Sequence, residues 1–153
     1  IDGTEWVGPW NDLAFGFYQI TKFYYYPGFH EPGSGLSAGI NLELWESLSD
    51  GDKAIFQAAC NAENNAMYSE FMANNGSALL TLINEHGVEL KRFPDEVFAE
   101  FGRLSKDVTV SAADGEIGQR ILESYLQNRE ATAGWTRISE QSYTQARDKV
   151  DAS

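Results

Sequence analysis

The sequence predicts a helix-rich α/β fold, and residues 49 to 93 carry most of that prediction. Ser49-Asp50-Gly51-Asp52 places a capping serine three residues before an acid, which is typical of a helix start. From there to His86, apolar residues recur on one 3.6-residue stripe: Phe56, Cys60, Met67, Phe71, Leu79, Leu82 and Ile83. Residues 88 to 93, Val-Glu-Leu-Lys-Arg-Phe, alternate apolar and polar side chains as a half-buried strand does. The order along this stretch of the chain is helix followed by strand.

Two further helical stretches follow this strand. Pro94 begins one, in which Val97, Phe98, Phe101 and Leu104 share a face. The other runs from Ala113 to about Arg147, and its apolar residues are Ile117, Ile121, Tyr125, Trp135, Ile138 and Tyr143. We expect Gly118 and Gly134 to bend or interrupt it. A helix of that length needs a partner surface.

Residues 1 to 47 differ in composition, because they hold every proline except Pro94 and most of the aromatic residues. Residues 22 to 26, Lys-Phe-Tyr-Tyr-Tyr, have strong strand preference and end at Pro27. Residues 37 to 41 form a possible second extended piece. We therefore expect loops with short strands up to about Ser47 and a helical region from residue 48 to 153, with one strand near 88–93.

Length and charge narrow the possible functions. The chain has 153 residues, enough for one domain, and its net charge of −12 repels phosphate backbones, so nucleic acid is not an expected partner. One cysteine and two histidines exclude a disulfide framework and a zinc site rich in these residues. The chain starts with Ile1 and shows no signal peptide, and we expect it to be a fragment.

Glu5 and Glu31 are the acids that suggest a site, because both lie among aromatic and turn residues rather than on a solvated helix face. Three interpretations stand side by side. Each glutamate is a loop carboxylate bonded to backbone amides, or the two form a glycosidase-like acid pair. In the third, they are oxygen ligands of a hard cation, together with a backbone carbonyl.

Two blocks of sequence resemble a known family. Residues 5 to 12 read Glu-Trp-Val-Gly-Pro-Trp-Asn-Asp, and residues 24 to 33 read Tyr-Tyr-Tyr-Pro-Gly-Phe-His-Glu-Pro-Gly. They resemble the solute-binding subunit of tripartite ATP-independent periplasmic (TRAP) transporters, in the branch that binds 2-oxo acids with a cation. The resemblance extends to residues 135 to 140, Trp-Thr-Arg-Ile-Ser-Glu. It implies that residues 1–153 are the C-terminal half of a two-lobed, type II-like periplasmic binding protein with a long C-terminal helix.

The resemblance also implies a metal site and a ligand pocket. The Glu5 carboxylate, the Trp6 backbone carbonyl and the Glu31 carboxylate correspond to the family's ligands of a sodium or calcium ion. A glutamine ligand and the arginine that holds the substrate carboxylate would come from the N-terminal half. A cation among these carboxylates removes their mutual repulsion. We assign Trp6, Trp10, Phe29 and His30 to the pocket for the organic ligand, with residues 1–47 lining the cleft.

The function implied is binding without chemistry. Two lobes close around a small organic carboxylate in the periplasm, and TRAP membrane subunits recognise the closed form. The C-terminal helix is exchanged between protomers in some family members, so a homodimer is expected through residues 113 to 147. The alternatives are a carbohydrate-active hydrolase that uses Glu5 and Glu31, and a plain interaction module in which neither glutamate binds a small ligand. We expect the chain alone to bind ligand weakly or not at all.

Overall fold

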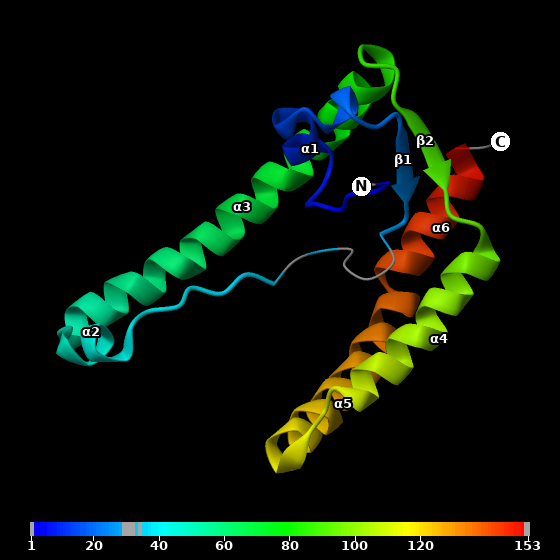
Figure 1. The fold of residues 1–153 in the computed structure, drawn as a ribbon. Helices are drawn as coiled ribbons and strands as arrows, with labels where there is room; N and C mark the ends of the chain where they lie inside the picture. The colour runs from blue at the N-terminus through cyan, green and yellow to red at the C-terminus, as the bar shows by residue number, and fades with distance from the viewer. Residues whose placement is uncertain (1, 29–32, 34, 152–153) are drawn as a thin grey trace. The chain divides into compact units, whose positions relative to one another are not determined.

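The structure is a computed structural model that describes residues 2–28, 33 and 35–151. For residue 151 it describes the backbone only. The chain folds into two compact units, Ile1–Asp95 and Glu96–Ser153. Figure 1 labels the helices and strands of both units. Two of the predicted metal ligands, Glu5 and Trp6, belong to the first unit.

The first unit begins with two short helical pieces, α1 at Pro9–Phe15 and a 3-10 turn, η1, at Phe17–Gln19. Pro9 stands at the first helical position, where its missing N–H costs nothing. Gly16 ends α1 with φ 74°, a left-handed conformation that residues with a Cβ rarely adopt. The composition of residues 1–47 led us to expect loops and short strands, so α1 is a correction.

The long predicted helix is confirmed as α3, Asp50–Asn84. The Ser49 side chain caps it by accepting a hydrogen bond from the backbone N–H of Asp52 at 3.1 Å. At the other end, Gly87 adopts φ 67° and the N–H of Val88 reaches back to the carbonyl of Leu82 at 3.0 Å. A short helix that we did not predict, α2 at Leu42–Ser47, precedes α3 and is capped by Asn41.

Two strands pair in parallel, β1 at Phe23–Tyr26 and β2 at Glu89–Arg92, in the register Phe23 to Glu89 and Tyr26 to Arg92. Both strands lie where the sequence predicts them. Parallel strands require a crossover connection, and α3 lies within that connection. The extended piece expected at residues 37 to 41 is not a strand.

The core of the first unit lies where α3 ends and β2 approaches. Ala78, Leu82 and Val88 are the buried apolar residues of the described chain. The Tyr18 ring of η1 stacks on His86 with 3.7 Å between the ring centroids. α1 lies against the C-terminal half of α3 (Figure 1), where the Trp10 ring meets Phe71 edge to face at 5.3 Å. The contact fixes the segment that precedes β1 against the longest helix.

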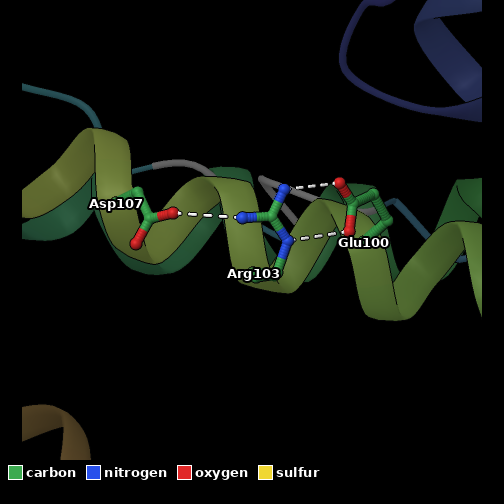
Figure 2. Close-up of polar contacts among 3 residues, drawn as sticks. All are labelled: Glu100, Arg103 and Asp107. Atoms are coloured by element: carbon green, nitrogen blue, oxygen red, sulfur yellow. Dashed lines mark hydrogen bonds and ion pairs between the residues drawn. The ribbon is translucent and has the colours of Figure 1, made fainter.

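The second unit consists of helices: α4 at Asp95–Ser111, whose first residue is the last of the first unit, α5 at Gly115–Ile138 and α6 at Glu140–Asp151. On α4, the Arg103 guanidinium bonds both oxygens of Glu100, at 2.9 and 2.6 Å, and one oxygen of Asp107 at 3.3 Å (Figure 2). Such pairs, three and four residues apart, support one face of a helix. In the described part of the chain, no helix is both long and apolar enough to cross a bilayer.

The predicted C-terminal helix differs from the structure in where it is interrupted. Gly118 and Gly134 both lie inside α5, and the break falls at Ser139, whose ψ of −103° is not helical. Ser139 caps the end of α5 through its own N–H and hydroxyl, which both bond the Trp135 carbonyl. A glycine lowers helix propensity by about 1 kcal/mol, which neighbouring residues readily offset.

Candidate functional site

The Glu5 and Trp6 pair lies in an extended segment that leads directly into α1. Both residues are exposed, and the Trp6 side chain retains 52% of its accessible surface. Its ring packs edge to face on Phe15 at 5.5 Å, so the segment folds back over the helix that it precedes. The Trp6 carbonyl and the Glu5 carboxylate are the oxygen donors that this segment offers.

Trp10, which we assigned to the ligand pocket, is half-buried between α1 and α3. Its backbone N–H donates to the Asn75 side-chain oxygen at 3.1 Å. That N–H is one of the first four of a helix, which have no partner within the helix. Asn75 therefore caps α1 from a neighbouring helix, in place of Gly8, whose position provides no side-chain cap.

The most unusual group in the first unit is the carboxylate of Asp12, on the first turn of α1. Asp12 is the buried charged residue of the described chain, with 6% of its surface exposed. Its Oδ2 accepts a hydrogen bond of 2.5 Å from the Tyr24 hydroxyl on β1. Its Oδ1 is buried with no hydrogen-bond partner among the described residues. The bond to Tyr24 joins α1 to β1.

Burial dominates the electrostatics of this pair. It raises the pKa of Asp12 above its ordinary value, while the hydrogen bond from Tyr24 and the backbone of Gly8 act in the opposite direction. The negative charge of Glu5 acts in the same direction as burial and raises the Asp12 pKa further. Burial and the bond to Asp12 also raise the pKa of Tyr24 far above its usual range, so its hydroxyl remains a proton donor.

The other predicted site residues lie outside the described part of the chain. These are Phe29, His30 and Glu31. The convergence of Glu5 and Glu31 on one ion therefore stays a prediction, as does the role of the pocket residues. Elsewhere, two open depressions lie along α5 and are lined by side chains of that helix alone, one of them by Ile121 and the other by Leu126. Neither has a lining residue from the predicted site.

The chemistry of the donors in the first unit fits a hard cation. Carboxylate and carbonyl oxygens are the ligands that Na⁺-like and Ca²⁺-like ions prefer, and neither a thiolate nor an imidazole lies in the Glu5–Trp6 segment. The described residues alone contain no cluster of three acidic, histidine or cysteine side chains able to hold a metal. Glu5 and Trp6 would thus supply part of a coordination shell.

Sequence reasoning missed Asp12, Tyr24 and Asn75 as residues that organise this region. A local signal for α1 was present, since Pro9 and Asp12 occupy positions typical of a helix start. The pairing of Asp12 with Tyr24, or of Trp10 with Asn75 across 65 residues, has no local signature. Only the fold brings these groups together.

Solved structures resemble this chain over nearly its whole length. A TRAP transporter solute-binding protein from Bordetella bronchiseptica matches 97% of the chain with a TM-score of 0.85 and 29% identity. Its crystal form is a mixed-occupancy dimer with copurified calcium and picolinate in one active site. A TRAP periplasmic solute-binding protein from Pseudoalteromonas atlantica, with bound sodium and pyruvate, matches 92% with a TM-score of 0.79 and 29% identity.

A curated relative points the same way. A monocarboxylate 2-oxoacid-binding periplasmic protein from Nostoc sp. is 33% identical over 144 residues, or 94% of this chain. The chain spans 39% of that relative and 44% and 43% of the two solved structures, so it corresponds to part of each. The predicted resemblance to TRAP solute-binding proteins and the helix-rich α/β fold of a partial binding protein are confirmed.

A family model describes most of the chain directly. The model of the bacterial extracellular solute-binding proteins, family 7 (DctP), matches residues 1–114, which include the Glu5–Trp6 segment, all of the first unit and α4. The match covers well over half of the sequence. This chain therefore belongs to family 7 of the bacterial extracellular solute-binding proteins.

Proposed function

We propose that this chain is part of the periplasmic solute-binding component of a TRAP transporter, which captures a small organic carboxylate with a bound cation. The observation that carries the proposal is the match of 97% of the chain to a TRAP protein that holds calcium and picolinate. The relative with sodium and pyruvate and the 2-oxoacid-binding relative narrow the ligand class to 2-oxo acids and similar carboxylates. Delivery to TRAP membrane subunits follows from the same assignment.

The cation is the link between the acidic chain and an acidic ligand. A carboxylate ligand near Glu5 and Glu31 would meet only negative charge, in a chain with 23 acidic and 11 basic residues. An ion held by the Glu5 and Glu31 carboxylates and the Trp6 carbonyl reverses the sign of the local charge. Residues 1–47 would line the cleft around it, with Trp6, Trp10, Phe29 and His30 against the organic part of the ligand.

Binding without turnover is the activity proposed, and family membership favours it over hydrolysis by the same two glutamates. Both alternatives use Glu5 and Glu31, so substitution of these residues separates them. Glu5→Gln and Glu31→Gln in a binding protein reduce cation affinity, and no substrate is converted before or after the change. In a hydrolase the same substitutions abolish a measurable rate of glycoside cleavage.

Terbium luminescence tests the cation site directly. Tb³⁺ replaces Ca²⁺ at oxygen sites and emits when a nearby tryptophan is excited, so a site at Glu5 and Trp6 should give sensitised emission that Ca²⁺ competes away. Glu5→Gln should weaken this binding about tenfold or more because a charged ligand is lost. Glu85→Gln, an exposed acid that follows α3, is the matched control.

A second variant locates the ion. Trp6→Phe keeps the backbone carbonyl but removes the indole next to the ion, and Trp10 remains in the proposed pocket. The variant should therefore lower the sensitised emission, while the Ca²⁺ affinity measured by calorimetry stays within about threefold of that of the unmodified chain. Unchanged emission in Trp6→Phe, or unchanged affinity in Glu5→Gln, would contradict the proposed site. Binding lost equally in Glu85→Gln would mean a diffuse acidic surface rather than a site.

We also propose self-association through α5 and α6. These helices expose large apolar residues over their length: Ile117, Ile121, Trp135, Ile138, Tyr143 and Val150, each at least 64% exposed. Exposed apolar area of this extent is typical of an interface, and the Bordetella relative was crystallised as a dimer. Light scattering should give a mass near twice 17.0 kDa. Ile138→Ser should shift the mass toward the monomer, and a monomeric unmodified chain at high concentration would contradict the proposal.

A further inference from the structure

The burial of Asp12 is costly and needs an explanation. A buried carboxylate oxygen without a hydrogen bond loses its contacts with water and gains none in the protein. This lowers the stability of the folded state by about 1–3 kcal/mol, and by more for a charged group. Asp12 is in this position, since Tyr24 satisfies Oδ2 and no described residue satisfies Oδ1. An asparagine at the same place would have nearly the same shape and would bury no charge. The charge itself is therefore the feature to explain.

The contacts of Asp12 hold the helix that directly follows the Glu5–Trp6 segment. Its backbone N–H bonds the carbonyl of Gly8 at 2.9 Å, two residues after Trp6. Its side chain bonds Tyr24 on β1, and Trp10, two residues earlier, is tied to Asn75 on α3. The segment that carries the two oxygen donors is thus anchored at its C-terminal end to a strand and to a helix.

The two acids of this region also act on one another. The Glu5 charge disfavours ionisation of Asp12. A cation bound by Glu5 would be attracted by Asp12 as well, and the repulsion between the acids would become an attraction of both to the ion. Asp12 itself is buried and bonded to Tyr24, so it would act through space and through the backbone and not as a ligand.

We propose that Asp12, held by the hydroxyl of Tyr24, is a positioning residue for the cation at Glu5 and Trp6. Its hydrogen bond fixes α1, the helix that follows the segment with the ligand oxygens, to β1, and its carboxylate adds a second negative charge to that of Glu5. The inference rests on the proposed function, because it requires a cation at Glu5. Partners behind the ligands of metal sites commonly change affinity about 10–100-fold when they are lost.

Three variants of the chain test this role with Tb³⁺ emission and Ca²⁺ competition. Asp12→Asn keeps the shape and an acceptor for Tyr24 but removes the charge. Tyr24→Phe removes the hydrogen bond and keeps the ring. Tyr25→Phe is the matched control, since Tyr25 is the next residue of the same strand, is 52% exposed, and stacks on Phe93 through its ring, which phenylalanine preserves.

We expect Asp12→Asn and Tyr24→Phe each to weaken Ca²⁺ affinity about tenfold. Tyr25→Phe should have the same Ca²⁺ affinity as the unmodified chain. The loss in Asp12→Asn should be larger for Ca²⁺ than for Na⁺, because the lost attraction scales with the charge of the ion. The double variant should lose less than the product of the two single losses, because both act through one bond. A general loosening of the fold would not distinguish ions by charge.

The outcomes separate this inference from the function that it rests on. If Glu5→Gln lowers the Ca²⁺ affinity and Asp12→Asn does not, the role of Asp12 is refuted and the cation site stands. If Glu5→Gln has no effect, the proposed function itself fails. Circular dichroism of each variant shows whether the fold is retained. If Tyr24→Phe does not fold, the comparison of Ca²⁺ and Na⁺ in Asp12→Asn decides alone, and equal losses for both ions would refute the role.

Discussion

The burial of Asp12 beside Tyr24 determines whether the stability of the folded chain rises or falls with pH. Burial makes the ionised form of Asp12 less favourable in the folded chain than in the unfolded chain, where its pKa is about 3.9. An acid whose folded pKa is raised binds more protons in the folded state, so stability falls as pH rises through that range. Below about pH 3.9 both states are protonated and the penalty disappears. Above the pKa that Asp12 has in the folded chain, the full destabilisation is present.

Asp12→Asn should therefore be more stable than the unmodified chain at neutral pH, because the amide removes the buried charge. The advantage should shrink as pH falls through the raised pKa of Asp12 and vanish below about pH 3.9. Urea unfolding at a series of pH values, in a sodium-free buffer with a chelator present, measures the difference. A variant that is less stable than the unmodified chain at neutral pH would contradict the cost assigned to this carboxylate.

Glu100 provides a control of opposite sign. The hydrogen bond from Arg103 lowers the pKa of Glu100, so its stabilising contribution is present above the unfolded pKa and is lost as pH falls through the lowered one (Figure 2). Glu100→Gln should be the less stable protein at neutral pH, and the gap should close in acid. Both side chains are exposed, so this effect is small.

At the scale of elements, α1 is the piece on which the geometry of the first unit depends. It has only seven residues, too few to be stable alone, and it is held by contacts with α3 and β1. The N–H of Trp10 is satisfied by Asn75 of α3, which makes that side chain a cap supplied by another element. The adjacent Asn74 bonds instead to the Glu70 carbonyl of its own helix.

Asn75→Ala should destabilise the first unit by about 1–2 kcal/mol, since it leaves a partly buried helix N–H without its acceptor. Asn74→Ala is the matched control. Its hydrogen bond stays within α3, where alanine is the better helix former, and the free energy of unfolding should change by less than about 0.5 kcal/mol. Denaturant unfolding compares the two. Equal effects would show that α1 does not depend on Asn75.

At the scale of the whole molecule, the sequence predicted the elements whose signals are local. Ser49 and Gly87 mark the ends of α3, and Pro94 marks the start of α4, because caps and prolines act within one turn. α1 was missed because Gly8-Pro9 reads equally well as a turn and as a helix start. The break at Ser139 was missed because no proline or glycine marks it.

The residues of the candidate site also fall into those that a local motif predicts and those that only the fold brings together. Glu5 and Trp6 emerged from a contiguous motif, and the motif stands next to α1 as a single segment. The groups that hold that segment, Asp12 with Tyr24 and Trp10 with Asn75, are paired only by the fold. Neither composition nor periodicity can predict a pair whose members are 12 or 65 residues apart on different elements.

The net charge of the chain predicts an order of affinities. With 23 acidic and 11 basic residues, the chain attracts cations and repels a 2-oxo acid at long range, so we expect the ion to bind first. The chain also corresponds to about two fifths of the relatives that carry a complete ligand site. We therefore expect it to bind Ca²⁺ measurably and pyruvate weakly or not at all.

Calorimetry on the chain tests this order, with pyruvate titrated first in a sodium-free buffer that contains a chelator and then in saturating Ca²⁺. Any pyruvate binding should appear only with Ca²⁺ and should disappear in Glu5→Gln, because the ion is what the ligand carboxylate would meet. The affinity should stay weaker than micromolar. Micromolar pyruvate binding in the chelator would show that a protein cation, and not a bound metal, receives the carboxylate. The two-carboxylate cation site would then lose its role in ligand capture.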